Sequence, residues 1–98
     1  MSNGIPRITT VTRNERFDKD FKSLPPDIQI AAKEAIKDLF KHPIPGSRRF
    51  HALQGYRNPK VFTIDILANH AYKISLEIEG QNANLRRVGT HKLIDRSA

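Results

Sequence analysis

Two runs of alternating residues, 60–67 and 72–78, constrain the fold of this chain more than any other feature. In each run nearly every second residue is apolar, and the residues between them include Asp65 in the first run and Lys73 in the second. Successive side chains of a strand point to opposite faces of its sheet, so each run predicts a strand with one apolar face. Asn69 between the runs is typical of a turn. The pattern therefore predicts two long antiparallel strands joined by a hairpin.

Two amphipathic helices are predicted before these strands. The segment 14–24 has apolar residues at helical spacing after an N-capping asparagine at its start. A second helix is predicted from Pro26 to His42, because Asp27 and the basic residues near His42 suit the helix dipole at its two ends. Pro43 ends this helix. Its apolar stripe comprises Ile28, Ala31, Ala32, Ala35, Ile36, Leu39 and Phe40.

Two further strands complete the predicted sheet. The β-branched residues of 7–12 predict a short first strand, and 83–88 predict a last strand that Gly89 ends, before a Thr-His segment and a short tail. The element order β-α-α-β-β-β predicts an α+β fold, in which a small antiparallel sheet carries the two N-terminal helices on one face. The opposite face, with Asp65 and Lys73, is expected to be open to a ligand.

The last strand leaves the orientation of two arginines undecided. Strict alternation would turn Arg87 towards the core with Leu85, and Arg86 towards the open face. A bulge that shifts the register, or a strand end that emerges from under the helices, would instead bring Arg87 to the open face. The sequence is compatible with both arrangements.

Length and composition limit the classes of protein. A chain of 98 residues predicts a single domain, 1–98, without a separate cofactor-binding unit. Seventeen Lys and Arg against ten Asp and Glu give a formal charge of +7, which favours a polyanionic partner: nucleic acid, an anionic membrane surface or an acidic protein. There is no cysteine, which excludes disulfides, thiol nucleophiles and thiolate metal sites. No metalloprotease, zinc, EF-hand, P-loop or serine-hydrolase motif occurs, so neither a metal nor a cofactor is expected.

The expected localisation is cytoplasmic. No apolar stretch approaches the roughly 20 residues of a transmembrane helix, and segment 1–6 lacks the apolar core of a signal peptide. The absence of cysteine fits a reducing compartment. A membrane is therefore not expected among the partners.

Two histidine segments point to chemistry on a phosphodiester: 51–55 (His-Ala-Leu-Gln-Gly) and 87–91 (Arg-Val-Gly-Thr-His). Cleaving RNA without a metal needs a base for the 2′-hydroxyl, a cation for the phosphorane and an acid for the 5′-oxygen. An imidazole suits both proton transfers, since its ordinary pKa of about 6.5 is near neutral pH, and a guanidinium can bind two phosphate oxygens. His51, His91 and Arg87 are therefore candidate catalytic residues. The alternatives are a loop-anchoring hydrogen bond for His51 and a solvated position for His91.

Other residues around the hairpin have two interpretations each. Asp65 could orient or deprotonate a histidine, or form an ion pair with Lys73. His70 lies beside the turn and could be either a solvent-exposed residue or one that contacts substrate. Tyr56 could stack on a base. Further cations, each a candidate phosphate ligand or a solvated side chain, are Arg48, Arg49, Arg57, Lys60, Lys73 and Arg86.

The order of elements and these motifs together resemble the RelE/ParE toxins of bacterial toxin-antitoxin systems, from Arg7 to Ile94. Within that superfamily, 51–55, 55–57 (Gly-Tyr-Arg) and 87–91 are most similar to the YafQ-type messenger-RNA interferases. The resemblance implies a ribosome-dependent endoribonuclease that cuts messenger RNA in the decoding site, and a small antitoxin protein that blocks it.

The resemblance also implies roles by position. His91 and His51 match proton-transfer histidines of the family, Arg87 matches the arginine before its Gly-Thr-His, and Asp65 approximates a family aspartate. The chain differs from the YafQ type in three ways: Leu-Gln-Gly and Gly-Tyr-Arg share one glycine, Lys60 stands where that subgroup has another histidine, and Asp65 aligns only after a one-residue shift. A lysine at that place can still contact phosphate, as lysines do in the RelE branch.

The leading hypothesis is an RNA endonuclease toxin with His91 as general acid, His51 or Asp65 as base, and Arg87 with nearby lysines as phosphate clamp. A contrasting hypothesis is a ParE-like toxin that inhibits DNA gyrase by contact and cuts no RNA. A third is a DNA-binding or structural protein without toxicity. For a toxin, we expect an acidic, partly disordered antitoxin segment to cover the basic face and to fold on binding.

Overall fold

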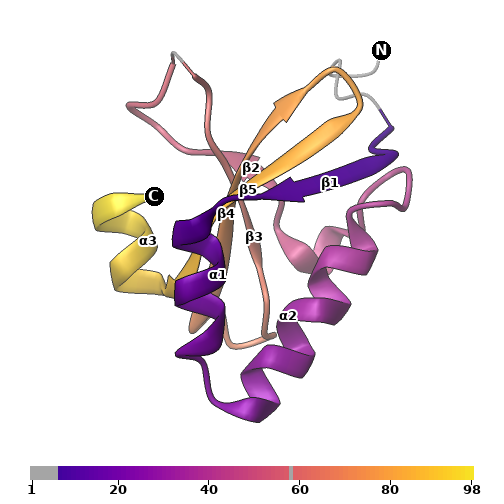
Figure 1. Cartoon of the computed structure of the whole chain (residues 1–98). Coiled ribbons are helices and arrows are strands. Elements are labelled where there is room, and N and C mark those ends of the chain that lie inside the picture. The colour runs from indigo at the N-terminus through magenta and orange to yellow at the C-terminus, as the bar shows by residue number, and fades with distance from the viewer. Residues whose placement is uncertain (1–6, 58) are drawn as a thin grey trace.

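The computed structural model describes residues 7–57 and 59–98, and its architecture is the predicted α+β type, with two N-terminal helices on one face of a sheet (Figure 1). The segment 1–6, where the sequence predicts no signal peptide, lies outside the described residues. Within the described ranges, no helix is both long and apolar enough to cross a membrane. The elements are β1 (Thr10–Arg13), α1 (Glu15–Lys22), α2 (Pro26–Asp38), a short 3-10 helix (Gly46–Arg48), β2 (His51–Ala52), β3 (Phe62–Asp65), β4 (Tyr72–Glu79), β5 (Asn82–Thr90) and α3 (His91–Ser97).

The sheet has the strand order β1-β5-β4-β3-β2 and is mixed rather than wholly antiparallel. β3, β4 and β5 pair antiparallel, as their alternation and short turns predict. β1 pairs with β5 in parallel, with Thr10 opposite Asn82, so the prediction of an antiparallel sheet was wrong at this edge. Only hairpins force antiparallel pairing, and β1 is connected to the rest of the sheet through two helices. β2 was not predicted, because two residues are too short to show an alternating pattern.

One face of the sheet packs against α1 and α2, where the predicted apolar stripes meet. The side chain of Asn14 caps α1 by accepting a hydrogen bond of 2.8 Å from the backbone N–H of Phe17, as predicted. α2 ends at Asp38 rather than at His42, because the backbone N–H groups of the next two residues bond to carbonyls three residues back. The buried side chains on this face are Ile8, Phe17, Leu24, Ile28, Ala32, Ala35, Leu39, Ile64, Ile66, Ile74, Leu76, Ala83, Leu85 and Val88.

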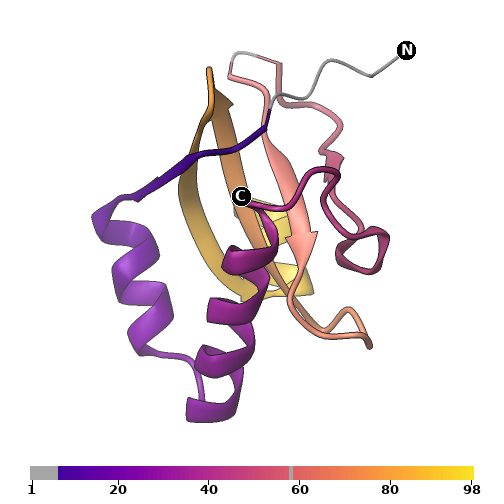
Figure 2. The same cartoon turned by 90° about the vertical axis from the view of Figure 1, so that its right-hand side faces the viewer.

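The opposite face of the sheet is covered, which corrects the prediction of an open face. Figure 2 shows α3 on the far side of the sheet from α1 and α2. The chain beyond β5 is therefore a helix and not a short tail, and its Ile94 packs with Val61 and Ala98 in a second, smaller core. Ile94 and Ala98 are four residues apart, so they share one side of the helix. On this face Asp65 and Lys73 are buried rather than exposed to a ligand, and they lie beside each other across the hairpin.

Arg48 fastens the loop after α2 to the end of β3. Its Nε lies 2.8 Å from Oδ2 of Asp38, and its Nη1 donates to the backbone carbonyls of Ile66 at 2.8 Å and Asp65 at 3.3 Å. Only 18% of its side chain is exposed. Arg48 is therefore not a solvated side chain, since its guanidinium joins two parts of the fold, and its contact with phosphate stays a prediction.

This network predicts a pH dependence of stability. Hydrogen bonds from Lys41 and Arg48 lower the pKa of Asp38 below its ordinary value of 3.8. A carboxyl whose pKa is depressed in the folded state stabilises that state above the unfolded pKa, and this stabilisation is lost as the pH falls through the folded pKa. We therefore expect the free energy of unfolding to fall more steeply below about pH 4 in the wild type than in Asp38→Asn, as measured by urea unfolding at stepwise lower pH. Parallel curves for the two proteins would contradict this.

Candidate active site

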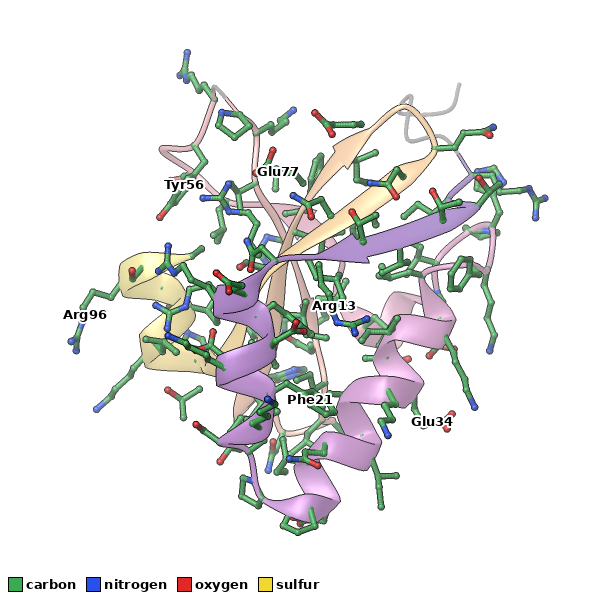
Figure 3. The ribbon with its side chains drawn as sticks, viewed as in Figure 1. Arg13, Phe21, Glu34, Tyr56, Glu77 and Arg96 are labelled. Carbon is green, nitrogen blue, oxygen red and sulfur yellow. The ribbon has the colours of Figure 1, made fainter. Side chains whose placement is uncertain are left out.

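His51 lies in a pocket between β2, the loop that follows it and α3. Its ring is exposed, with Nδ1 at 3.2 Å from the carbonyl oxygen of Ala52 and Nε2 at 3.4 Å from Oγ1 of Thr63. Figure 3 shows Tyr56 on the loop between β2 and β3, on the side of the molecule where α3 lies, and Tyr56 packs against the second core. The pocket has a volume of about 420 Å³ and is lined by His51, Ala52, Leu53, Gln54, Tyr56 and Asp95.

His91 is the first residue of α3, and an aspartate on the same helix holds its ring. Its Nε2 lies 2.6 Å from Oδ2 of Asp95, and half of the His91 side chain is exposed. The hydroxyl of Thr90 caps the helix by accepting from the N–H of Leu93. A Cβ at Gly89 would lie 2.5 Å from Cδ2 of Leu93, so glycine at this position lets the first turn of α3 approach the strand. The Gly-Thr-His motif thus builds the turn that presents His91.

A bulge in β5 decides between the two orientations of Arg87 left open by the sequence. It places Arg87 opposite Ser75, on the face of the sheet away from Leu85. Ser75 is opposite Arg87 while Leu76 is opposite Leu85, so Arg86 is the extra residue. The guanidinium of Arg87 is held by a carboxylate of α1. It forms two hydrogen bonds of 2.9 Å to the carboxylate of Asp20 on α1, and these raise the pKa of Arg87 above its ordinary value. Arg87 is thus tied to the opposite edge of the sheet from β2.

Asp65 is buried among cations. It has both of the contacts that the sequence left open, one with a histidine and one with Lys73. Its side chain is only 3% exposed. Oδ2 contacts Nδ1 of His70 and lies 3.8 Å from Nε of Arg49, while Oδ1 lies 3.9 Å from Nζ of Lys73 across the hairpin. His70 is therefore not a simple exposed turn residue. Asp65 itself has no route to a ligand in this conformation.

The remaining basic candidates divide into exposed and paired residues. Arg57 and Lys60 are exposed near the His51 pocket. Lys73 is buried beside Asp65, and Arg86 pairs with Glu77 and donates to the terminal carbonyl of Ala98. Only the first two are accessible to a large ligand as they stand.

The fold brings some of the predicted residues together and separates others. His51, Thr63, Ser75 and Arg87 are in register across four strands. Because neighbouring strands are about 4.8 Å apart, the backbones of His51 and Arg87 are separated by about 14 Å. His51 and His91 approach the same pocket, His51 directly and His91 through Asp95, which lines it.

Sequence reasoning missed Asp95 and Asp20. The spacing of His91 and Asp95, four residues apart, would have indicated a side-chain pair if 91–97 had been interpreted as a helix. No sequence signal connects Asp20 with Arg87, since they are 67 residues apart. Among residues 7–57 and 59–98, no three histidine or carboxylate side chains lie close enough to hold a metal ion.

Comparison with known proteins places the fold among solved toxin structures. By sequence, the chain matches no protein-family model and no curated protein. By structure, it is similar to YafQ from E. coli, with a TM-score of 0.71 and 16% identity over 86% of this chain and 94% of that one. It is also similar to a chain of the DinJ-YafQ toxin-antitoxin complex of E. coli (TM-score 0.70, 15% identity, 91% and 98% covered). A third match is the RelB-RelE antitoxin-toxin complex from Methanococcus jannaschii (TM-score 0.62, 24% identity, 89% and 99% covered). The chain therefore has the fold of the RelE and YafQ toxins.

Proposed function

We propose that this chain is the toxin of a toxin-antitoxin system and that it is a metal-independent endoribonuclease that cuts messenger RNA, in the cytoplasm and on the ribosome. The observation that carries the proposal is the convergence of His51 and the His91–Asp95 pair on one pocket. His51 lines this pocket and His91 is held by Asp95, which also lines it, so two imidazoles are available for the two proton transfers that RNA cleavage requires. The fold shared with RelE and YafQ toxins supports the same conclusion.

In this mechanism His91 is the general acid. The carboxylate of Asp95 accepts a hydrogen bond from Nε2, which stabilises the charged imidazolium and leaves Nδ1 to donate a proton to the 5′-oxygen as its bond to phosphorus breaks. His51 removes the proton from the 2′-hydroxyl, whose oxygen attacks phosphorus; the alternative base, Asp65, is buried and acts only through a side chain that it contacts. The products are a 2′,3′-cyclic phosphate and a 5′-hydroxyl end. Of the two bases, His51 is the exposed one and Asp65 the buried one.

Arg87 is the proposed clamp for the phosphate, together with Arg57, Lys60, Lys73 and Arg86. A phosphate and a carboxylate both accept two parallel hydrogen bonds from a guanidinium, so a phosphate can replace Asp20 as the partner of Arg87. The exposed Arg57 and Lys60 bind the RNA backbone, and each phosphate that they neutralise makes binding more sensitive to salt.

The proposed protein partner is an acidic antitoxin. Two of the similar structures are complexes of a toxin with DinJ or RelB. The formal charge of +7 favours an acidic partner segment that folds on the basic surface. Calorimetric titration with the small protein encoded beside this one should give a saturable binding curve, and the absence of heat at any salt concentration would contradict the partner assignment.

Induced expression followed by mapping of transcript ends tests the function, with a gyrase supercoiling assay on the same cells. We expect growth arrest, new transcript ends inside translated regions, and unchanged supercoiling. Intact transcripts with inhibited supercoiling would instead indicate a contact inhibitor of gyrase. Normal growth with intact transcripts would indicate a protein that is not a toxin.

A further inference from the structure

Asp65 is coupled to the surface through two exposed side chains, those of His70 and Arg49. The Asp65 carboxylate is 3% exposed, so it cannot reach a nucleotide, whereas 40% of the His70 side chain is exposed. Nδ1 of His70 contacts Oδ2 of Asp65 directly. The contact with His70 is closer than the 3.8 Å approach of Arg49, so the His70 ring is the most direct route from this buried carboxylate to a ligand.

These contacts define which ring nitrogen of His70 carries the hydrogen. An ionised carboxylate can only accept a hydrogen bond, so Nδ1 of His70 donates to Asp65. In the neutral ring Nε2 is then an acceptor, and it accepts a hydrogen bond of 3.4 Å from Nη1 of Arg49. Arg49 is exposed over 60% of its side chain. His70 thus presents a basic nitrogen beside an accessible guanidinium.

The backbone holds both of these residues in a conformation that non-glycine residues rarely adopt. The φ angle is +62° at His70 and +50° at Arg49. The turn of His70 is closed by a 3.0 Å hydrogen bond from the N–H of Ala71 to the side chain of Asn69. The backbone N–H of His91 donates to the carbonyl of Ala71 at 2.9 Å, which places the residue after His70 next to His91. Residues kept in such strained conformations concentrate at functional sites.

We propose that His70 is a catalytic residue and the general base of the RNA cleavage, an inference that rests on the proposed function. Nε2 of His70 takes the proton from the 2′-hydroxyl, the 2′-oxygen forms a bond to phosphorus, the bond from phosphorus to the 5′-oxygen breaks, and His91 protonates that oxygen. Asp65 is a positioning residue that stabilises the resulting imidazolium of His70. For this step the guanidinium of Arg49 releases Nε2 of His70 and binds a non-bridging oxygen of the same phosphate. His51 then lines the pocket without taking the proton.

His70→Asn is the most informative substitution. Asparagine tolerates a positive φ better than most residues and its amide can donate to Asp65, so the turn is retained while the basic nitrogen is lost. We expect the cleavage rate of a defined messenger RNA to fall by about 100-fold or more, with an unchanged thermal unfolding midpoint. His42→Asn, an exposed histidine beyond the end of α2, is the matched control and should cleave at the wild-type rate.

His70→Gly separates a catalytic from a structural role. Glycine relieves the backbone strain at this position, and the space left by the ring admits free imidazole. Cleavage should be restored in proportion to added imidazole, while the same treatment of His51→Gly should have no such effect. Wild-type cleavage by His70→Asn, or imidazole rescue confined to His51→Gly, would overturn the assignment. So would loss of activity in both His70 variants without rescue, which indicates a structural role. Wild-type protein that cuts no RNA would refute the proposed function itself.

Discussion

Replacing His91 with alanine is expected to reduce RNA cleavage by two to four orders of magnitude, about the contribution of a general acid, and to abolish growth arrest. The 5′-oxygen is a poor leaving group unless it is protonated as its bond to phosphorus breaks. His91 is half exposed at the start of α3, and its Nε2 lies 2.6 Å from Oδ2 of Asp95. The substitution removes this donor and leaves the Thr90 cap of the helix in place.

The effect of His91→Ala is measured as the single-turnover rate on a defined RNA and as growth after induction. Lys92→Ala, an exposed neighbour on the same helix, serves as the control and should cut at the wild-type rate. Circular dichroism should show the same fold in both variants. Full toxicity in His91→Ala would rule out its role as the acid.

Replacing Ile94 with alanine is expected to lower the free energy of unfolding by about 2–5 kcal/mol, the range found for large-to-small changes in a core. The Ile94 side chain has no exposed surface and packs with Val61 and Ala98, where α3 meets the sheet. A domain of this size has a total stability of only about 5–15 kcal/mol, so the change is large. Because α3 also carries His91 and Asp95, cleavage should fall together with stability.

Chemical unfolding of a graded series measures this effect. Ile94→Val removes a single methylene and should cost about 0.5–1.5 kcal/mol. Arg96→Ala, on the exposed side of the same helix, should change the stability by less than about 0.5 kcal/mol. Equal stabilities for Ile94→Ala and Arg96→Ala would mean that α3 does not hold the second face of the sheet.

The parts of the fold that were predictable have a local pattern. Alternation in β3 and β4 set which side chains face α1 and α2, and these include Ile64, Ile74 and Leu76. Asn14 signalled the start of α1 because capping depends only on a side chain and the next turn of backbone. The two histidine segments also predict His51 and His91 as site residues from consecutive residues, and that assignment stays a prediction.

The predictions that the structure contradicts concern features that depend on contacts between distant segments of the chain. α3 has only seven residues, too few to display two turns of amphipathic pattern, and its burial depends on Val61 from another strand. The open face was wrong for this reason, and an accessible Asp65 was wrong because His70, Arg49 and Lys73 surround its carboxylate. The pairing of Arg87 with Asp20 follows from the parallel placement of β1 beside β5, which brings α1 to the edge of the sheet. No window of sequence contains that information.

The chemistry of the cut ends tests the central proposal most directly. A defined messenger RNA is incubated with the purified protein, with and without ribosomes, and the ends of the fragments are identified. Attack by the 2′-oxygen predicts a 2′,3′-cyclic phosphate on the upstream fragment and a 5′-hydroxyl on the downstream one, and no cut when the scissile nucleotide is 2′-deoxy. Cleavage of the 2′-deoxy substrate, or fragments that end in 3′-hydroxyl and 5′-phosphate groups, would contradict a mechanism in which histidines take a proton from the 2′-hydroxyl and give one to the 5′-oxygen.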